Sequence, residues 1–355
     1  MPSSASEGRW PRGRGSASDP PTRFQTLVSV PEPEAEPQPD PRTEIVDDDT
    51  RSILSWNESP DVGFRVGINP YRGCEHGCPY CYARAFHEYL DLSGGLTFET
   101  RIIVKRRAPA LLAEALDGPQ WQPQVIGLSG ATDCYQPLER RLQLTRACLA
   151  VLAACRNPVH VITKNALVVR DRDLLAALAA VEAAVVWISL TTLDEGLARA
   201  LEPRASGPAA RLRAIRALRE AGIPVGVNCA PLIPGLTDHE LPALLAAARA
   251  AGAGCASYQI LRLPGPTAQL FQAWLERHAP TRAAVVLERV ASCHGGRLDA
   301  PPGCRHRGQG PWAAHIAQLF AVHARRQGLD REPPPLSTAA FCPPRGRQQA
   351  LWDGL

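Results

Sequence analysis

The feature that most constrains the fold is an alternation of short apolar runs with longer helical stretches in the middle of the chain. The runs, apolar or rich in β-branched residues, are expected to be strands at residues 64–68, 124–128, 159–163, 185–190, 224–228 and 257–261. Helical stretches are expected between them, at residues 83–90, 138–155, 169–181, 209–221 and 238–251. Strand–helix alternation of this kind argues for a parallel sheet covered by helices. Six such units predict an α/β fold, a partial (β/α)6 TIM-like barrel instead of the full eight units.

Working residues in such barrels lie on the loops that follow the strands, and the loop after the first strand is unusual. It places Cys74, Cys78 and Cys81 in a C-x3-C-x2-C pattern. Three thiols this close cannot all form disulfides, a closed structural zinc site normally has four protein ligands, and His76 is too cramped to be a comfortable fourth. An iron–sulfur cluster fits better, since a cubane held by three cysteines leaves one iron open. Taken alone, the cysteines indicate either such a cluster or another metal.

Composition indicates the cellular compartment of the protein and whether it spans a membrane. The chain of 355 residues is 45% hydrophobic and can fill a sizeable core, and it has eleven cysteines. The first 30 residues carry charges and prolines in place of an apolar signal segment, so we expect a cytoplasmic protein with reduced thiols. The longest apolar run, Leu174 to Leu190, is interrupted by Glu182 and reads as a helix followed by a buried strand. No membrane span is predicted.

Composition also divides the chain into segments. Residues 1–50 are rich in Pro, Ser, Glu and Arg and are predicted to be a disordered tail. The barrel is expected over residues 53–262 and a helical C-terminal extension over residues 263–330. Residues 331–355, which open with a run of prolines, are expected to form an irregular tail.

The basic residues are unevenly distributed. The formal net charge of +4 is too small to imply a nucleic-acid partner by itself. From Arg262 onward, however, twelve arginines stand against six acids. A solvated arginine-rich face and a phosphate-binding surface are both open interpretations of this excess.

Lysine and tyrosine are scarce in a chain biased toward Ala, Arg, Gly and Pro. Lys105 and Lys164 are the two lysines. Four of the six tyrosines lie in or just after the cysteine motif: Tyr71, Tyr80, Tyr82 and Tyr89. In a chain with that bias, the presence of a lysine or tyrosine is a stronger indication of a functional role than usual.

The cysteine motif, with Tyr80 before its last cysteine and a position after the first of six strands, resembles the radical S-adenosylmethionine (radical SAM) superfamily. Wider motifs resemble the bacterial branch related to spore photoproduct lyase, labelled DNA-repair-photolyase-like, whose substrates are not established. These motifs lie at residues 69–74, 132–137, 162–165, 189–194, 201–204 and 230–235. The resemblance covers about residues 53–345.

This resemblance implies a 4Fe–4S cluster on Cys74, Cys78 and Cys81, with the amino and carboxylate groups of S-adenosylmethionine (SAM) on the open iron. One electron would cleave the sulfonium to methionine and a 5′-deoxyadenosyl radical, which abstracts hydrogen from a substrate. A reductant such as flavodoxin or ferredoxin would supply the electron. The protein would position these groups and exclude water and oxygen.

The resemblance also places SAM-binding residues on successive strand ends. The expected residues are Tyr80, Ser129, Gly130, Lys164, Ser189, Thr191 and Asn228. Lys164 is expected to contact the SAM carboxylate, with a solvated strand-end lysine as the alternative. Ser129 and Gly130 stand where family members bind the amino group through backbone, although Ser-Gly-Ala replaces a Gly-Gly-Glu-like motif.

Ser189 and Thr191 are expected near the ribose or carboxylate and Asn228 near the adenine, with ordinary exposed hydroxyls and a structural turn as the alternatives. Asp133, Tyr135 and Gln136 are expected to face the substrate. Cys134 is a candidate to return a hydrogen atom, although a small apolar filler is the favoured interpretation.

The favoured function is therefore a radical SAM enzyme that acts on a nucleic-acid lesion or base. A peptide or small-metabolite substrate is the close alternative, and a non-catalytic iron–sulfur or zinc-binding regulatory module is the alternative of another class. Glu202 and Arg204 are expected to brace a helix start, and a second metal site at Cys293, Cys304 and Cys342 is weakly indicated. The oligomeric state is not predictable from these patterns.

Overall fold

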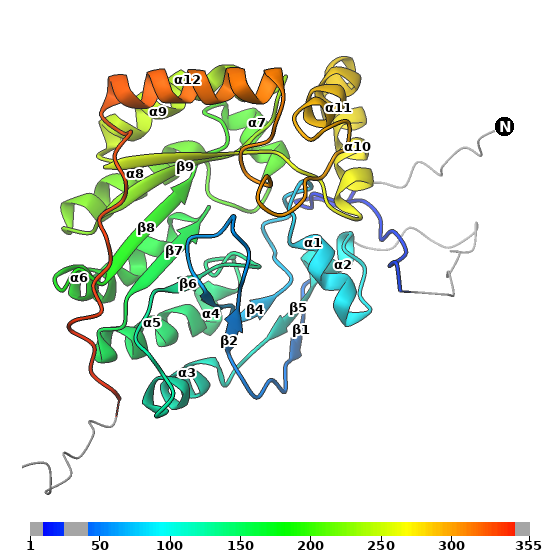
Figure 1. The fold of residues 1–355 in the computed structure, drawn as a ribbon. Helices are drawn as coiled ribbons and strands as arrows, with labels where there is room; N and C mark the ends of the chain where they lie inside the picture. The colour runs from blue at the N-terminus through cyan, green and yellow to red at the C-terminus, as the bar shows by residue number, and fades with distance from the viewer. Residues whose placement is uncertain (1–9, 25–41, 345–355) are drawn as a thin grey trace, which may run out of the picture.

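A seven-stranded sheet is the centre of the computed structural model, which describes residues 10–24 and 42–344 (Figure 1). Its order is β10-β9-β8-β7-β6-β3-β2. The parallel strands are β3 (Val66–Ile68), β6 (Ile126–Leu128), β7 (Val159–Thr163), β8 (Ala184–Ser189), β9 (Val225–Leu232) and β10 (Cys255–Ile260). β2 (Leu54–Trp56) adds an antiparallel edge to β3. The predicted α/β fold with six parallel strands is confirmed, and each expected strand overlaps an observed one.

Helices follow the strands in the expected alternation and surround the sheet (Figure 1). Up to β10 they are α1 (Arg84–His87), η1 (Glu88–Leu90), α2 (Leu96–Thr100), α3 (Ala108–Asp117), α4 (Glu139–Leu142), α5 (Leu144–Cys155), η2 (Ala166–Asp171), α6 (Arg172–Ala179), α7 (Glu195–Leu201), α8 (Pro208–Glu220), η3 (Asp238–Glu240) and α9 (Leu241–Ala251). α9 ends at Gly252, whose φ of +104° lies in the left-handed region that favours glycine. Among the described residues, no helix is long and apolar enough to cross a membrane.

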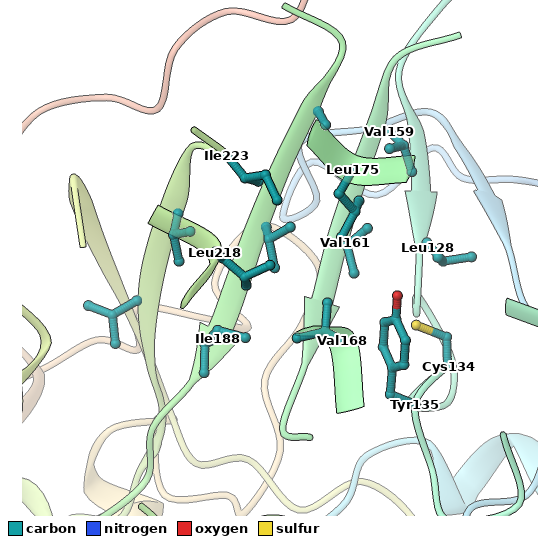
Figure 2. Packing of buried hydrophobic residues seen from close by; sticks show 14 of the residues in the cluster. Leu128, Cys134, Tyr135, Val159, Val161, Val168, Leu175, Ile188, Leu218 and Ile223 are labelled. Atoms are coloured by element: carbon teal, nitrogen blue, oxygen red, sulfur yellow. The ribbon is translucent and has the colours of Figure 1, made fainter. Parts of the chain in front are cut away.

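The core lies between the sheet and these helices. Every residue of β8 is buried, as expected for a central parallel strand covered on both faces. β7 alternates buried and half-buried residues along its length. Figure 2 shows how Val161 of β7, Ile188 of β8 and Leu218 of α8 pack in the same apolar layer. This packing holds the strands together and fixes where their C-terminal ends lie.

The N-terminal part of the chain differs from its prediction. A disordered tail was expected over residues 1–50, but β1 (Glu44–Asp47) pairs with β5 (Arg101–Val104), which also pairs with β4 (Tyr71–Arg72) in a second, three-stranded sheet. Residues 10–24 are also ordered and lie beside α1 and α10 (Figure 1). The prediction was therefore wrong for the described parts of this range, while residues 1–9 and 25–41 lie outside the described residues.

Backbone groups make much of this N-terminal contact, which composition does not reveal. The amide of Gly15 donates to the Glu99 carboxylate at 2.9 Å, and the amide of Leu96 donates to the Ser18 carbonyl at 3.0 Å. A Cβ placed on Gly15 would overlap the Gly77 carbonyl oxygen, so the two backbones approach closely. Residues 10–24 thus cross the cysteine loop as a strap.

After β10 the chain forms α10 (Thr267–His278), η4 (Pro280–Arg282), α11 (Ala283–Ser292) and α12 (Pro311–Gln327), and α12 packs against α9 (Figure 1). Phe271 and Trp274 of α10 belong to the same apolar cluster as Cys78 and Tyr80 of the cysteine loop. Residues 331–344 are irregular and attach to the barrel through backbone hydrogen bonds of Ser337 and Cys342. Residues 345–355 lie outside the described residues.

Candidate active site

A large cavity opens at the C-terminal ends of the parallel strands, with an empty volume of about 1110 Å³ including its mouth. The cysteine loop between β4 and α1 forms one wall. The residues that follow or end β6, β7, β8, β9 and β10 form most of the remainder. This is the position at which barrels of this kind carry their working residues.

Cys74, Cys78 and Cys81 all line this cavity. Their loop turns at Gly73 and Gly77, whose φ angles of +79° and +72° lie in the left-handed region. A side chain on Gly73 would also run into backbone carbonyls of the following segment. Burial raises the pKa of all three thiols, so they stay protonated unless a cation compensates the thiolate charge.

The spacing of the cysteines suits a multi-iron cluster. Within residues 10–24 and 42–344, no three or more His, Cys, Asp or Glu side chains are grouped so as to hold a single metal ion. Cysteines that ligate a cubane each bind a different iron, so their sulfurs stand farther apart than ligands of one ion. Three cysteines on one cavity wall are the donor set of a cubane that leaves one iron open, whereas a closed structural zinc site needs four protein ligands. The lack of a single-ion grouping in those ranges gives no support to a second metal site at Cys293, Cys304 and Cys342.

A buried charge network lies behind the loop. The Tyr80 hydroxyl donates to the Glu202 carboxylate, which also accepts from the Thr191 hydroxyl at 2.7 Å and pairs with the Arg211 guanidinium. Burial raises the pKa of Glu202, but the Arg211 and Lys164 charges outweigh it and hold that pKa at about 2. Glu202 thus joins the cysteine loop to β8 and α8. Its pairing with Arg211, near the start of α8, agrees with the helix-start brace expected for it, and the Tyr80 contact adds a link to the cysteine loop.

Asp133 ties the cysteine loop to the end of β7. Its carboxylate accepts from the Thr163 hydroxyl and the Lys164 amide, both at 2.7 Å, and from the Tyr135 amide at 2.9 Å. His76 Nδ1 lies 3.5 Å from the same carboxylate. Asp133 lines the cavity, but its oxygens are occupied by these neighbours, so it positions the loop.

Cys134 and Tyr135 do not face the cavity. Both are buried in the core beside Leu128 and Val161 (Figure 2). The chain turns at Ser129, whose hydroxyl accepts from the Cys134 amide at 2.7 Å, and the two side chains pack inward. The expectation that Tyr135 contacts substrate is therefore corrected, and the small-filler interpretation of Cys134 agrees with its burial.

Gln136 is also buried and holds the cysteine loop from behind. Its side chain accepts from the Glu75 amide at 2.9 Å and donates to the Gly73 carbonyl at 3.2 Å. The substrate contact expected for Gln136 is therefore replaced by a structural one. The carboxylate of Glu75 lies 3.1 Å from the guanidinium of Arg204, so Arg204 also contacts this loop.

Four of the expected SAM-binding residues besides Tyr80 line the cavity: Ser129, Lys164, Ser189 and Asn228. Lys164 Nζ donates to the Ala230 carbonyl at 3.2 Å and lies 6.0 Å from the Tyr80 ring centroid. Asn228 Oδ1 is buried and has no hydrogen-bond partner in the described part of the chain. This acceptor therefore has room for a donor from a bound molecule.

Two of the expected SAM-binding residues, Gly130 and Thr191, are not among the residues that line the cavity. The carbonyl of Gly130 accepts from the Tyr82 hydroxyl at 2.7 Å. Thr191 is fully buried and faces Glu202. Their contacts are thus with the protein.

The wall from the C-terminal part of the chain was not predicted residue by residue. Arg262, Arg305 and His306 line the cavity there. Arg305 Nε is buried without a hydrogen-bond partner among the described residues, and the Arg262 guanidinium lies 5.1 Å from the Tyr82 ring centroid. The arginine excess after residue 262 was the signal that pointed to this wall.

Residues 68–248 match the family model of the Radical SAM superfamily. An uncharacterized protein of Mycobacterium tuberculosis is 36% identical over 282 residues, 79% of this chain and 80% of the relative. An uncharacterized protein of Methanocaldococcus jannaschii is 30% identical over 185 residues, 52% of this chain and 66% of the relative.

Among solved structures, spore photoproduct lyase complexed with dinucleoside spore photoproduct matches with a TM-score of 0.58 and 16% identity, over 79% of each chain. At that identity the likeness shows a shared fold. Its Y98F mutant matches with the same TM-score.

Proposed function

Because the chain belongs to the radical SAM superfamily, we propose that it is an enzyme that removes a hydrogen atom from a nucleic-acid lesion or base in its large cavity. One observation carries this proposal. The three cysteines and two arginines, Arg262 and Arg305, line the same cavity. The proposed cluster ligands and groups that attract phosphate therefore share one cavity, which supports a nucleic-acid substrate.

In this proposal Cys74, Cys78 and Cys81 hold a 4Fe–4S cluster, with SAM at the iron that lacks a cysteine. When bound, the two cofactors supply one-electron cleavage of the sulfonium and the abstraction of hydrogen. Asp133 and Gln136 keep the loop in place through the contacts described above. A reductant such as flavodoxin or ferredoxin is the expected partner.

Four residues around the cavity would orient SAM. Lys164 offers a point charge for its carboxylate. The unpartnered Asn228 Oδ1 offers an acceptor for an amino or hydroxyl group of the adenosine. Ser129 and Ser189 line the same cavity and add hydroxyl groups.

The substrate side is formed by Arg262, Arg305 and Tyr82. Arg305 Nε has no hydrogen-bond partner among the described residues, and Tyr82 presents an aromatic ring beside the Arg262 charge. Unstacked bases are recognised in proteins by stacking on aromatic rings and arginine planes, with phosphates held by arginine. The neighbour of shared fold, spore photoproduct lyase, is complexed with a dinucleoside, which supports the same substrate class here.

The first test is SAM cleavage by the anaerobically reconstituted and reduced protein. We expect 5′-deoxyadenosine, and we expect Cys78→Ala to abolish it because the cluster loses one of its ligands. Cys342→Ala, which removes an exposed cysteine outside the cavity, is the matched control and should keep full production. Unchanged production by Cys78→Ala, or a colourless zinc-loaded protein, would reject the ligand assignment.

The second test addresses the substrate. Binding to single-stranded and duplex DNA should weaken steeply as salt rises, because phosphate contacts release counterions. A substrate deuterated at the reacting carbon should transfer deuterium to 5′-deoxyadenosine. No binding at low salt would reject the nucleic-acid substrate and favour a peptide or small metabolite.

A further inference from the structure

A second cavity lies beside the first. Its empty volume is about 680 Å³. The two cavities share four lining residues: Ala83, Phe98, Ala131 and Thr132. These four shared residues form the wall between the two cavities, and a molecule that occupied both cavities would cross that wall.

The second cavity is lined by Lys105, one of the two lysines of the chain. The residue is only 5% exposed, and its ammonium has no hydrogen bond or ion pair with the described residues. Burial and the nearby Arg72 charge lower the pKa of Lys105, and the Asp48 carboxylate opposes this shift. The ammonium lines the cavity and has no acceptor among the described residues, so it is available to pair with an anion there.

The surroundings of Lys105 do not cancel its charge. Arg72 lines the same cavity and pairs with Asp48 at 3.4 Å. Two positive groups thus stand against one negative group, which leaves one net positive charge. His87 Nε2, also in this lining, is buried without a hydrogen-bond partner among the described residues. The polar groups that line the cavity can therefore accept a phosphate.

Three exposed aromatic residues lie in or just before α1 and η1, and we name them the aromatic ladder: Tyr82, Phe86 and Tyr89. They are 37%, 48% and 66% exposed, respectively. Tyr82 lines the first cavity, whereas Phe86 and Tyr89 line the second. The Tyr82 and Phe86 ring centroids are 6.1 Å apart. The ladder therefore runs across the wall between the two cavities.

Cationic groups accompany the ladder at both ends. Arg262 lies over Tyr82. The Arg23 guanidinium lies 5.0 Å from the Tyr89 ring centroid and also pairs with Glu88 at 3.2 Å, and the Phe24 ring lies 5.8 Å from that of Tyr89. Exposed rings beside arginines form the stacking surface that single-stranded nucleic acid uses, because every base has a π-face and every linkage a charge. An apolar metabolite would leave Lys105 unpaired, whereas a nucleotide satisfies both the rings and the ammonium.

We propose that the second cavity binds the nucleotide next to the one in the first cavity, with its phosphate at Lys105 and Arg72 and its base on Phe86 and Tyr89. This inference rests on the proposed nucleic-acid substrate. It makes the substrate a single strand, or an opened duplex, of at least two nucleotides. The ladder then guides successive bases from one cavity to the other.

Fluorescence anisotropy with a labelled thymidine oligonucleotide of about twelve residues, between about 50 and 200 mM salt, tests the proposal. Lys105→Met should weaken binding about tenfold and reduce the log–log salt slope by about 0.7, the loss of one phosphate contact to a single strand. Tyr89→Ala should also weaken binding about tenfold through lost stacking, with the salt slope unchanged. Arg325→Gln, at an 86% exposed arginine of α12, should change neither quantity.

Tyr89 is exposed, so Tyr89→Ala tests the proposal even if Lys105→Met does not fold. Wild-type affinity and salt slope in both variants would overturn the second site and leave the proposed function standing. Thymidine monophosphate binding as tightly as the oligonucleotide, with the same loss in the variants, would assign the site to a free nucleotide and overturn the strand proposal. Failure of the wild-type protein to bind the oligonucleotide at low salt would remove the proposed function and this inference together.

Discussion

Glu202 is a charged group enclosed by the protein, and its partners explain how it is tolerated. Arg211 compensates its charge, and the Tyr80 and Thr191 hydroxyls satisfy its oxygens. A buried ion pair contributes little net stability, but removal of one partner leaves an uncompensated charge. Glu202 and Arg211 therefore act as a unit that fixes the back of the cysteine loop.

We expect Glu202→Gln to lower the free energy of unfolding by about 3 kcal/mol, because Arg211 stays buried without its counter-charge. Urea denaturation measures the change. Glu276→Gln on the exposed face of α10 is the matched control and should change stability by less than about 0.5 kcal/mol. Equal stability of Glu202→Gln and the wild type would contradict this account of the network.

The residues of the site differ in how far the sequence reveals them. Cys74, Cys78 and Cys81 are recognisable because their spacing is local, and Lys164 is recognisable as a strand-end lysine in an arginine-rich chain. The Tyr80–Glu202 contact joins residues 122 positions apart, so no local sequence pattern predicts it. Whether a polar residue after a strand faces the cavity or the core depends on how the loop turns, which is why Tyr135 was misplaced.

Strand β7 carries a polar residue inside the packed layers. The His160 ring lies between Phe64 and Trp187, at centroid distances of 5.8 and 6.0 Å. Its Nε2 is buried without a hydrogen-bond partner among the described residues. Burial lowers the pKa of His160 from 6.5 to about 4, so the folded protein holds this ring neutral at pH 7.

This shift predicts a pH-dependent stability. Since the unfolded chain protonates His160 more readily, the folded state loses stability as pH falls from about 6.5 to about 4, by at most about 3 kcal/mol. His160→Phe removes this titration and should be less sensitive to pH over the same window. Denaturation curves at several pH values measure the difference. Parallel stability profiles for the two proteins would show that His160 titrates normally in the fold.

The elements themselves were predictable where they are long and periodic. The six parallel strands are predicted by apolar runs, and most of the helices by 3.6-residue periodicity. β1, β2 and β4 have only two to four residues, and β1 and β4 pair with a segment distant in sequence, so they carry no comparable signal. Short strands of this kind depend on their partners.

On the scale of the whole molecule, the strap of residues 10–24 covers the cysteine loop from outside. Arg14 donates to the Glu99 carbonyl at 2.8 Å, and Gly15 lies against Gly77 of the loop. Composition predicted disorder here because few apolar residues are present. The segment is ordered through backbone contacts and close approach instead of through a core of its own.

We expect Gly15→Val to displace the strap and to speed the loss of the visible absorbance of a reconstituted cluster in air several-fold. The added side chain would overlap the Gly77 carbonyl, while the barrel itself is untouched. The thermal midpoint should stay close to that of the wild type. Gly13→Asn is the matched control, because the space around Gly13 is open and asparagine tolerates its φ of +69°. Equal bleaching rates in the two variants would show that the strap does not protect the loop.

The apolar cluster that joins α10 to the cysteine loop bears on how proteins of this architecture are recombined. Trp274 and Phe271 pack with Cys78 and Tyr80, so the C-terminal helices complete the wall on which the cysteines rest. A chimera that transplants the barrel without these helices would carry the cysteines but lack the surface that shapes them. A chimera designed to change substrate specificity would therefore have to exchange the cysteine loop and the C-terminal helices together.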